Sequence, residues 1–297
     1  MFKTPIFKGS CTAIVTPFNE NGINYDKMRE LIDFQYDNNT EALVICGTTG
    51  ENATMTQYEQ EELIDFACKY NDGRMKIVAG IGSNNTEKAL KNAKCAKHFG
   101  ADGVLMVTPY YNKTTQAGLI EHFTYVADRV DIPMILYNVP SRTGIGIKSE
   151  TYKELSKHPN INGIKEASGD FSLFAATRAL CGDDLFIWSG NDDNTLPMMA
   201  LGAIGVISVA SNILPGIVSK ICSLCLIGKF EKASEIFTRY NELFSTLFIE
   251  TNPIPIKTAM NLAGYDVGAP RLPLTGMSEG NLERLKTVLS NSGIKVK

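Results

Sequence analysis

The sequence predicts an α/β fold, a (β/α)8 TIM barrel that carries a C-terminal helical appendage. Short apolar runs, often β-branched, alternate eight times with longer amphipathic runs along the 297 residues. The short runs lack the polar–apolar alternation of a half-exposed strand, which favours strands buried on both faces of a parallel sheet. Strand–helix units at spacings of roughly 20 to 35 residues are typical of this barrel.

Eight apolar runs are the expected strands, and each is followed by an expected helix. The strands cover Cys11–Val15, Ala42–Cys46, Lys76–Gly80, Gly103–Val107, Pro133–Tyr137, Ile161–Lys165, Asp184–Trp188 and Gly205–Val209. The helices cover Asp26–Asp37, Thr56–Tyr70, Thr86–Phe99, Thr115–Arg129, Ser149–Lys157, Asp170–Leu180, Asp193–Leu201 and Pro215–Leu226. The expected helix caps are Thr56, with Glu59 three positions on, and Thr86, Ser149 and Asp170.

Three more helical patterns follow Ile227, over Lys229–Phe248, Pro253–Leu262 and Ser278–Ser290. Eight units already close a barrel over residues 1–227, so these helices accompany no strand. We expect residues 228–297 to form a three-helix extension outside the barrel that shields a surface or builds a subunit contact.

Composition and charge exclude several classes of protein. The chain is 44% hydrophobic and 21% charged, which is ordinary for a globular protein and excludes wholesale disorder. A formal net charge of −3 gives no sign of the basic face that nucleic-acid binders show. Residues 194–219 carry no charge, but Pro197, Gly202 and Pro215 interrupt them, so we expect no membrane span.

The seven cysteines are odd in number and scattered, which fits reduced thiols better than a disulfide framework. Cys222 and Cys225 form a C-x-x-C pattern inside an apolar helical run, without a second pair or a nearby histidine, so we expect no redox or metal role there. Met1–Gly9 lacks the apolar stretch of a secretory signal. These features predict a cytoplasmic protein.

Lys165 is the first candidate for chemistry, because the active site of such a barrel lies at the carboxyl ends of the strands. It alone among the lysines follows an apolar strand at that end. It is either a buried member of an ion pair or a nucleophile. A neutral lysine amine attacks a carbonyl to form a Schiff base, and the iminium makes the adjacent carbon acidic.

Other strand ends supply groups that suit this reaction. Tyr137 closes the neighbouring strand and is either a proton-shuttling phenol or a rim aromatic. Thr48 and Thr49 lie in a glycine turn that either holds a carboxylate or enters a helix. Arg142 either binds a second carboxylate or is a solvated surface side chain. Glu51 either caps a helix or binds an ion.

The histidines argue against a metal site. His98, His122 and His158 lie in or just after expected helices, and none closes a strand. Metal-dependent barrels usually bring histidines and carboxylates to the strand ends. We expect no catalytic metal and no Ser–His–Asp triad.

Five strings give the sequence a family resemblance. They are GTTGE at 47–51, TPYYN at 108–112, YNVPSRTG at 137–144, GIKEASG at 163–169 and GVISV at 205–209. With these motifs in order, the sequence resembles the pyruvate-dependent class I aldolase family that includes N-acetylneuraminate lyase, from about residue 7 to about residue 289. The Arg-Thr after YNVPS favours the branch that uses L-aspartate 4-semialdehyde, since relatives that act on sugar acids differ there.

The resemblance implies a Schiff base between Lys165 and pyruvate, with Tyr137 as the general acid/base. Thr48 then links Tyr137 to Tyr111 of a neighbouring subunit in a proton relay. The reaction it implies condenses pyruvate with L-aspartate 4-semialdehyde on the route to lysine and diaminopimelate, without a cofactor. Family members are commonly homotetramers, built as dimers of tight dimers. A sugar-acid lyase of the same family and a non-catalytic keto-acid-binding barrel remain as alternatives.

The resemblance also implies the substrate contacts. Thr49, with Thr48, holds the pyruvate carboxylate, and Arg142 binds the carboxylate of the semialdehyde. Gly190 and Ile207 contribute backbone groups around the reactive lysine.

A lysine-binding allosteric pocket at the tight-dimer interface is a further implication. Asn84 and Tyr110 match lysine-inhibited relatives, but Gln60 stands where those have a histidine and Lys88 where they have a glutamate. Lys88 reverses the charge that meets the effector's amino group, and like charges about 4 Å apart repel by on the order of 1–4 kcal/mol. We predict weak or absent inhibition by lysine.

Overall fold

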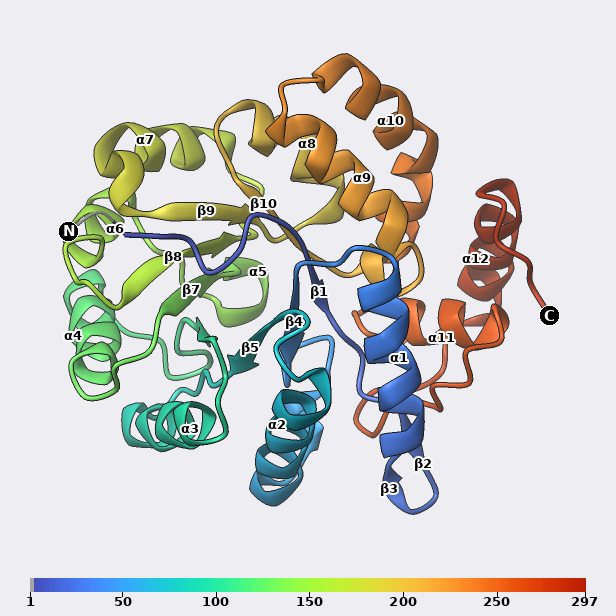
Figure 1. The fold of residues 1–297 in the computed structure, drawn as a ribbon, viewed down its shortest axis with the longest axis horizontal. Coiled ribbons are helices and arrows are strands. Elements are labelled where there is room, and N and C mark those ends of the chain that lie inside the picture. The colour runs from blue at the N-terminus through green and yellow to red at the C-terminus, as the bar shows by residue number, and fades with distance from the viewer. Residues whose placement is uncertain (1–2) are drawn as a thin grey trace.

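The computed structural model describes residues 3–297 and confirms the predicted barrel (Figure 1). Eight parallel strands close in the order β1-β10-β9-β8-β7-β6-β5-β4, and β4 pairs back with β1. They are β1 (Gly9–Ala13), β4 (Ala42–Ile45), β5 (Lys76–Gly80), β6 (Gly103–Val107), β7 (Met134–Asn138), β8 (Ile161–Glu166), β9 (Phe186–Ser189) and β10 (Gly205–Ser208). Each overlaps the strand that the apolar runs predict.

Helices connect the strands and surround the barrel (Figure 1). They are α1 (Tyr25–Asp37), α2 (Gln57–Asn71), α3 (Thr86–His98), α4 (Gln116–Ala127), α6 (Ser149–Leu155), α7 (Phe171–Cys181), α8 (Thr195–Ala200) and α9 (Pro215–Leu226). The expected helices after the barrel are α10 (Phe230–Thr246), α11 (Ile254–Leu262) and α12 (Glu279–Asn291), which lie to one side of it in Figure 1.

Several short elements were not predicted, because they span too few residues to show a period. They are the hairpin β2 (Phe18–Asn19) and β3 (Gly22–Ile23), the helix α5 (Pro140–Thr143), and the 3₁₀ turns η1 (Asn52–Thr54), η2 (Gly182–Asp184), η3 (Asp192–Asn194) and η4 (Ala210–Asn212).

Two of the four predicted helix caps are correct. Thr56 forms a complete capping box with Glu59, and Asp170 accepts a hydrogen bond from the backbone of α7. The prediction of Thr86 was wrong, because the preceding Asn85 caps α3 with its side chain. Ser149 was also wrong, since it is the first residue of α6 and no side chain caps that helix.

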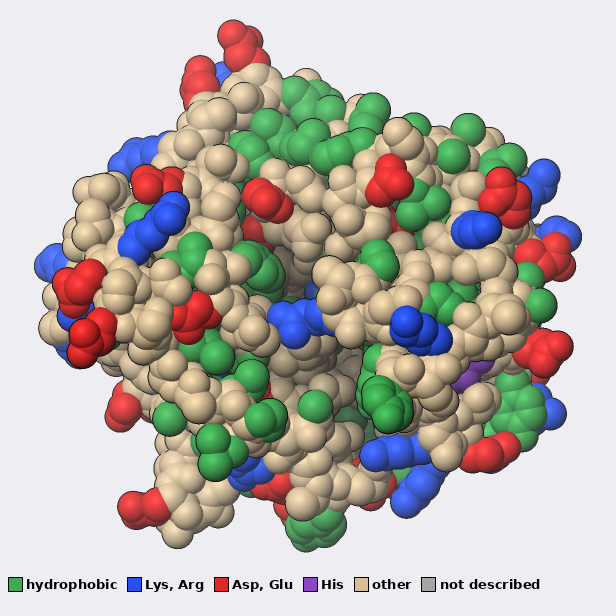
Figure 2. Space-filling model, turned by 180° about the vertical axis from the view of Figure 1, so that it is seen from behind, with side chains coloured by type: hydrophobic (Ala, Val, Ile, Leu, Met, Phe, Trp, Pro, Cys, Tyr) green, Lys and Arg blue, Asp and Glu red, His purple; other side chains and the backbone are tan. Residues whose placement is uncertain are grey.

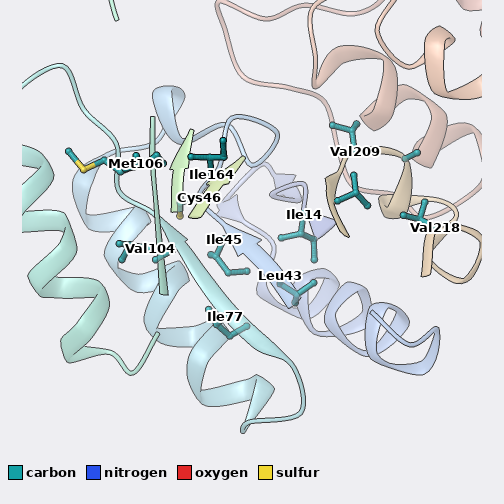
Figure 3. Packing of buried hydrophobic residues seen from close by; sticks show 14 of the residues in the cluster. Ile14, Leu43, Ile45, Cys46, Ile77, Val104, Met106, Ile164, Val209 and Val218 are labelled. Atoms are coloured by element: carbon teal, nitrogen blue, oxygen red, sulfur yellow. The ribbon is translucent and has the colours of Figure 1, made fainter. Parts of the chain in front are cut away.

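The strands are buried on both faces, as their apolar runs predict. In β4, Ala42 and Val44 belong to the cluster inside the barrel. Leu43 and Ile45 belong to the cluster between the strands and the surrounding helices (Figure 3). Such alternation places two apolar layers on one short strand.

Apolar side chains fill the interior of the barrel, and two stacked aromatic rings are among them. Trp188 is fully buried and stacks on Phe7, with ring centroids 4.8 Å apart. Gly163 makes room for this pair, because a Cβ there would lie 2.6 Å from the Trp188 ring and 2.3 Å from the Phe186 carbonyl oxygen. With the interior filled, an active site must lie at one end of the barrel.

The uncharged stretch 194–219 is no membrane segment in this fold. It comprises the end of η3, then α8, β10, η4 and the first turn of α9. Across residues 3–297, every helix is too short or too polar to cross a bilayer.

Candidate active site

A cavity of about 690 Å³ opens at the carboxyl ends of the strands, a size typical of small-molecule sites. Its walls come from Thr48, Thr49, Tyr137, Val139, Ser141, Arg142, Lys165, Ala167, Gly190, Asn191, Val209 and residues 248–252. The structure therefore gathers six of the predicted site residues in one place. Figure 2 shows one face of the molecule, hollowed near its centre, with acidic and basic side chains interspersed around it.

Lys165 and Tyr137 lie side by side in this cavity because they pair in register on β8 and β7. The Lys165 ammonium nitrogen is 4.5 Å from the centroid of the Tyr137 ring. Both side chains are buried, with 5% and 7% of their surface exposed. In the part of the chain that the structure describes, Lys165 forms no ion pair within 4.0 Å. The geometry thus favours a nucleophile over a buried ion-pair member.

The turn that follows β4 is held by the C-terminal extension. Asn252 donates from Nδ2 to the Thr49 hydroxyl at 2.9 Å, and its own Oδ1 has no partner among the described residues. The backbone oxygen of Asn252 accepts a hydrogen bond from the guanidinium of Arg142 at 3.2 Å. The extension therefore does more than pack outside the barrel, because residues 248–252 complete the cavity wall.

Glu51 neither caps a helix with its side chain nor lies free to bind an ion. Its Oε1 is 2.8 Å from the ammonium of Lys257 in α11, and both side chains are fully buried. Its Oε2 accepts from the Arg271 backbone at 2.8 Å. Burial lowers the pKa of Lys257, and the Glu51 charge opposes that shift. This ion pair fastens the turn at residues 48–51 to the extension.

No sequence pattern indicates that Asn252 and Lys257 belong to the site. Both lie in the expected helical appendage, about 200 positions from the turn that they contact. Only the folded chain brings the two segments together.

Gly190 lies in the cavity wall, where β8 and β9 approach closely. A Cβ at this position would lie 2.6 Å from that of Ala167. Ile207, by contrast, is fully buried in the barrel interior, and its side chain takes no part in the wall.

Tyr111 lies outside the cavity of its own chain. Its side chain is 91% exposed, and its backbone is in the left-handed region with φ of 71°. The neighbouring Tyr110 is 41% exposed. Two adjacent exposed tyrosines are unusual for a surface that faces only water.

A second cavity of about 490 Å³ adjoins the first and shares Thr48 and Arg142 with it. Gln60, Lys88 and Tyr110 contribute to its wall. Asn84 does not, and its backbone oxygen instead accepts from the Asn112 side chain at 2.9 Å. The structure thus brings together three of the four residues of the predicted allosteric pocket.

No three His, Cys, Asp or Glu side chains within residues 3–297 converge closely enough to hold a metal ion.

Comparison with known proteins identifies the family. The sequence matches the dihydrodipicolinate synthetase family over residues 6–292, and the chain belongs to that family. It is 53% identical over 291 residues to the 4-hydroxy-tetrahydrodipicolinate synthase of Thermoanaerobacter sp. (strain X514), covering 98% of each chain.

Solved structures agree with the sequence comparison. The fold matches dihydrodipicolinate synthase from Aquifex aeolicus at 46% identity with a TM-score of 0.95, covering 98% of this chain and 100% of that one. The chloride-inhibited dihydrodipicolinate synthase from Acinetobacter baumannii, complexed with pyruvate, is 38% identical with a TM-score of 0.95, covering 97% and 99%. These relatives confirm the prediction of an enzyme and favour the synthase over the sugar-acid lyase and the non-catalytic barrel.

Proposed function

We propose that this enzyme condenses pyruvate with L-aspartate 4-semialdehyde to give 4-hydroxy-tetrahydrodipicolinate, the first committed step toward lysine and diaminopimelate. The observation that carries the proposal is the buried Lys165 amine, which faces a small-molecule cavity beside a phenol without an acidic partner among residues 3–297.

The chemistry starts at the Lys165 nitrogen. It attacks C2 of pyruvate, the carbonyl oxygen leaves as water, and an iminium forms. Loss of a methyl proton gives an enamine, whose carbon attacks the aldehyde of the second substrate. The amino group of that substrate then replaces Lys165 at C2, which closes the ring and frees the lysine. Tyr137 carries protons between these steps.

The remaining groups bind the two substrates. The Thr48–Thr49 turn offers hydroxyls and backbone N–H groups to the pyruvate carboxylate. Arg142, at the cavity wall, suits the carboxylate of the semialdehyde, because its planar fork of donors binds two oxygens at once. Gly190 and Ile207 supply backbone groups near Lys165.

Trapping tests this assignment directly. Borohydride added with pyruvate reduces a Schiff base irreversibly, so we expect the intact mass to increase by one reduced pyruvyl group on Lys165. Lys165→Ala serves as the control and gains no mass. An unchanged mass of the wild-type chain would remove Schiff-base chemistry. Consumption of the semialdehyde, but not of N-acetylmannosamine, distinguishes the synthase from a sugar-acid lyase.

We further propose that Tyr111 enters the site of a neighbouring subunit, where Thr48 links it to Tyr137 in a homotetramer built from tight dimers. The exposure of Tyr111 and Tyr110 supports this assembly. Mixed Tyr111→Phe and Lys165→Ala chains test it, because a hybrid dimer holds one complete site. Regained activity supports exchange between subunits, and no regain, or a monomer in light scattering, contradicts it.

The second cavity supports weak regulation by lysine. Lys88 places a cation in its wall, and the side-chain amide of Gln60 is held by the Asn52 and Met55 carbonyl oxygens at 2.6 and 3.2 Å. We expect Lys88→Glu to create or strengthen inhibition by lysine. Tight inhibition of the unmodified enzyme would contradict the proposal.

We place the enzyme in the cytoplasm, where its seven free cysteines would stay reduced.

A further inference from the structure

A polar cluster lies directly behind Lys165 and Tyr137, on the other face of the same two strands. Successive residues of a strand point to opposite faces. Asn138 and Glu166 follow the two site residues and pair with each other in register. Both are buried, with 0% and 3% of their surface exposed, so any displacement of one strand end against the other would disturb this pair.

The carboxylate of Glu166 accepts four hydrogen bonds. Asn138 Nδ2 lies 3.1 and 3.0 Å from its two oxygens, the Tyr152 hydroxyl lies 3.0 Å from Oε2, and the Ser168 backbone nitrogen lies 2.8 Å from Oε1. A buried carboxylate is costly unless its oxygens are satisfied, and these donors satisfy both. Burial raises the pKa of Glu166, although the hydrogen bonds from these donors oppose that shift.

The cluster joins three strand ends and one helix. The Asn138 side-chain oxygen accepts from the Ile147 backbone at 3.1 Å, just before α6. The backbone oxygens of Asn138 and Glu166 accept from Ala167 and Gly190 at 2.9 and 2.8 Å. The ends of β7, β8 and β9 are therefore fixed relative to one another at the level of the cavity.

We propose that Glu166 and Asn138 are positioning residues that hold the amine of Lys165 and the phenol of Tyr137 at their working separation. Neither side chain faces the cavity, so they act through the strands that carry the reacting groups. The inference rests on the proposed Schiff-base role of Lys165. A displacement of about 1 Å costs on the order of a hundredfold in rate, so small changes at this pair are measurable.

Three variants and a matched control test the proposal. Asn138→Ala and Glu166→Ala remove the cluster, and Glu166→Gln restores its size and part of its hydrogen bonding. Asn162→Ala is the control, because Asn162 is a buried asparagine at the opposite end of β8 that binds the Thr4 backbone oxygen at 2.8 Å.

We expect Asn138→Ala and Glu166→Ala to lower kcat and the rate of borohydride trapping by about tenfold or more, and to change KM for pyruvate much less. Glu166→Gln should recover most of the loss, and Asn162→Ala should lower thermal stability while kcat stays within twofold. If the cluster variants lose stability as the control does but keep kcat and the trapping rate, the proposal is wrong.

Tyr152→Phe keeps the test decisive if an alanine variant does not fold, since it removes one of the three donors to Glu166. We expect a several-fold decrease in kcat with a shifted pH profile, and an unchanged kcat and profile would overturn the proposal. Wild-type trapping separates the two ideas: its absence refutes the Schiff base, whereas normal wild-type trapping with unaffected variants refutes only the positioning role.

Discussion

The two sides of the active site are held by different means. The turn at residues 48–51 is fastened by a buried ion pair to Lys257, which is 206 positions further along the chain. The end of β8 is fastened by Glu166, whose partners are hydrogen-bond donors from the adjacent strand, α6 and the next turn. The turn proposed to bind pyruvate thus depends on the C-terminal extension, whereas the proposed nucleophile is fixed within the barrel.

The largest expected effect comes from removal of the Lys165 amine, which leaves the Glu51–Lys257 ion pair and the Glu166 cluster intact. We expect Lys165→Ala to lower kcat by on the order of 10⁴-fold or more, because the covalent route is lost. Thermal unfolding should change little, since no partner of this amine is left unpaired among residues 3–297. Turnover with both substrates measures the loss, and activity within tenfold of the wild type would refute the role of Lys165.

The next effect breaks the support from the extension. Lys257→Met leaves Glu51 buried without its cation, which should cost about 3–5 kcal/mol of unfolding free energy. The double variant Lys257→Met/Glu51→Gln should recover part of that loss, because no unpaired charge remains. Urea unfolding measures both, and equal stabilities for the single and the double variant would refute the cost assigned to the unpaired Glu51 charge.

A smaller effect isolates the contact to the turn. Asn252→Ala removes the donor to Thr49, and the loss of one buried hydrogen bond costs about 1 kcal/mol. We expect KM for pyruvate to increase about fivefold, with kcat nearly unchanged. Steady-state kinetics provide the check. A lower kcat at constant KM would instead show that Asn252 supports the chemistry at Lys165 and not the binding of pyruvate.

The smallest expected effects are differences in how the two sides contribute to stability as the pH changes. Arg271 lowers the pKa of Glu59 to about 2 from 4.5, so this contribution to stability is complete above pH 4.5 and is lost as the pH falls through 2. Burial raises the pKa of Glu166, so its contribution is complete below pH 4.5 and is lost as the pH rises through the raised value.

Unfolding free energies measured as a function of pH compare the two sides of the site. Glu59 and Arg271 belong to the side held by the extension, and Glu166 belongs to the side held within the barrel. Relative to the wild type, the loss of unfolding free energy in Glu59→Gln should shrink as the pH falls below 4.5. The unfolding free energy of Glu166→Gln should increase relative to that of the wild type as the pH rises. If the unfolding free energy of both variants changed with pH in parallel with that of the wild type, the predicted opposite pH dependences of Glu59 and Glu166 would be wrong.

Sequence patterns predicted the fold because both-face burial leaves an apolar run in every strand, as in β4. They also located Lys165 and Tyr137, since the ends of parallel strands meet at one rim. Contacts that form only in the folded chain could not be predicted from these patterns. Asn252 and Lys257 lie in the C-terminal extension, which the sequence predicts to be separate from the site. The cap errors at Thr86 and Ser149 are shifts of one residue, where a neighbouring position occupies the cap instead.

The stack of Phe7 and Trp188 has a consequence for the order of events. These packed rings close the interior of the barrel, so both reactants, the released water and the product pass through the end where the strands carry Lys165 and Tyr137. In the proposed chemistry pyruvate has to reach the amine of Lys165 first, because only the enamine formed on that amine attacks the aldehyde. We therefore expect kinetics in which pyruvate adds before the aldehyde.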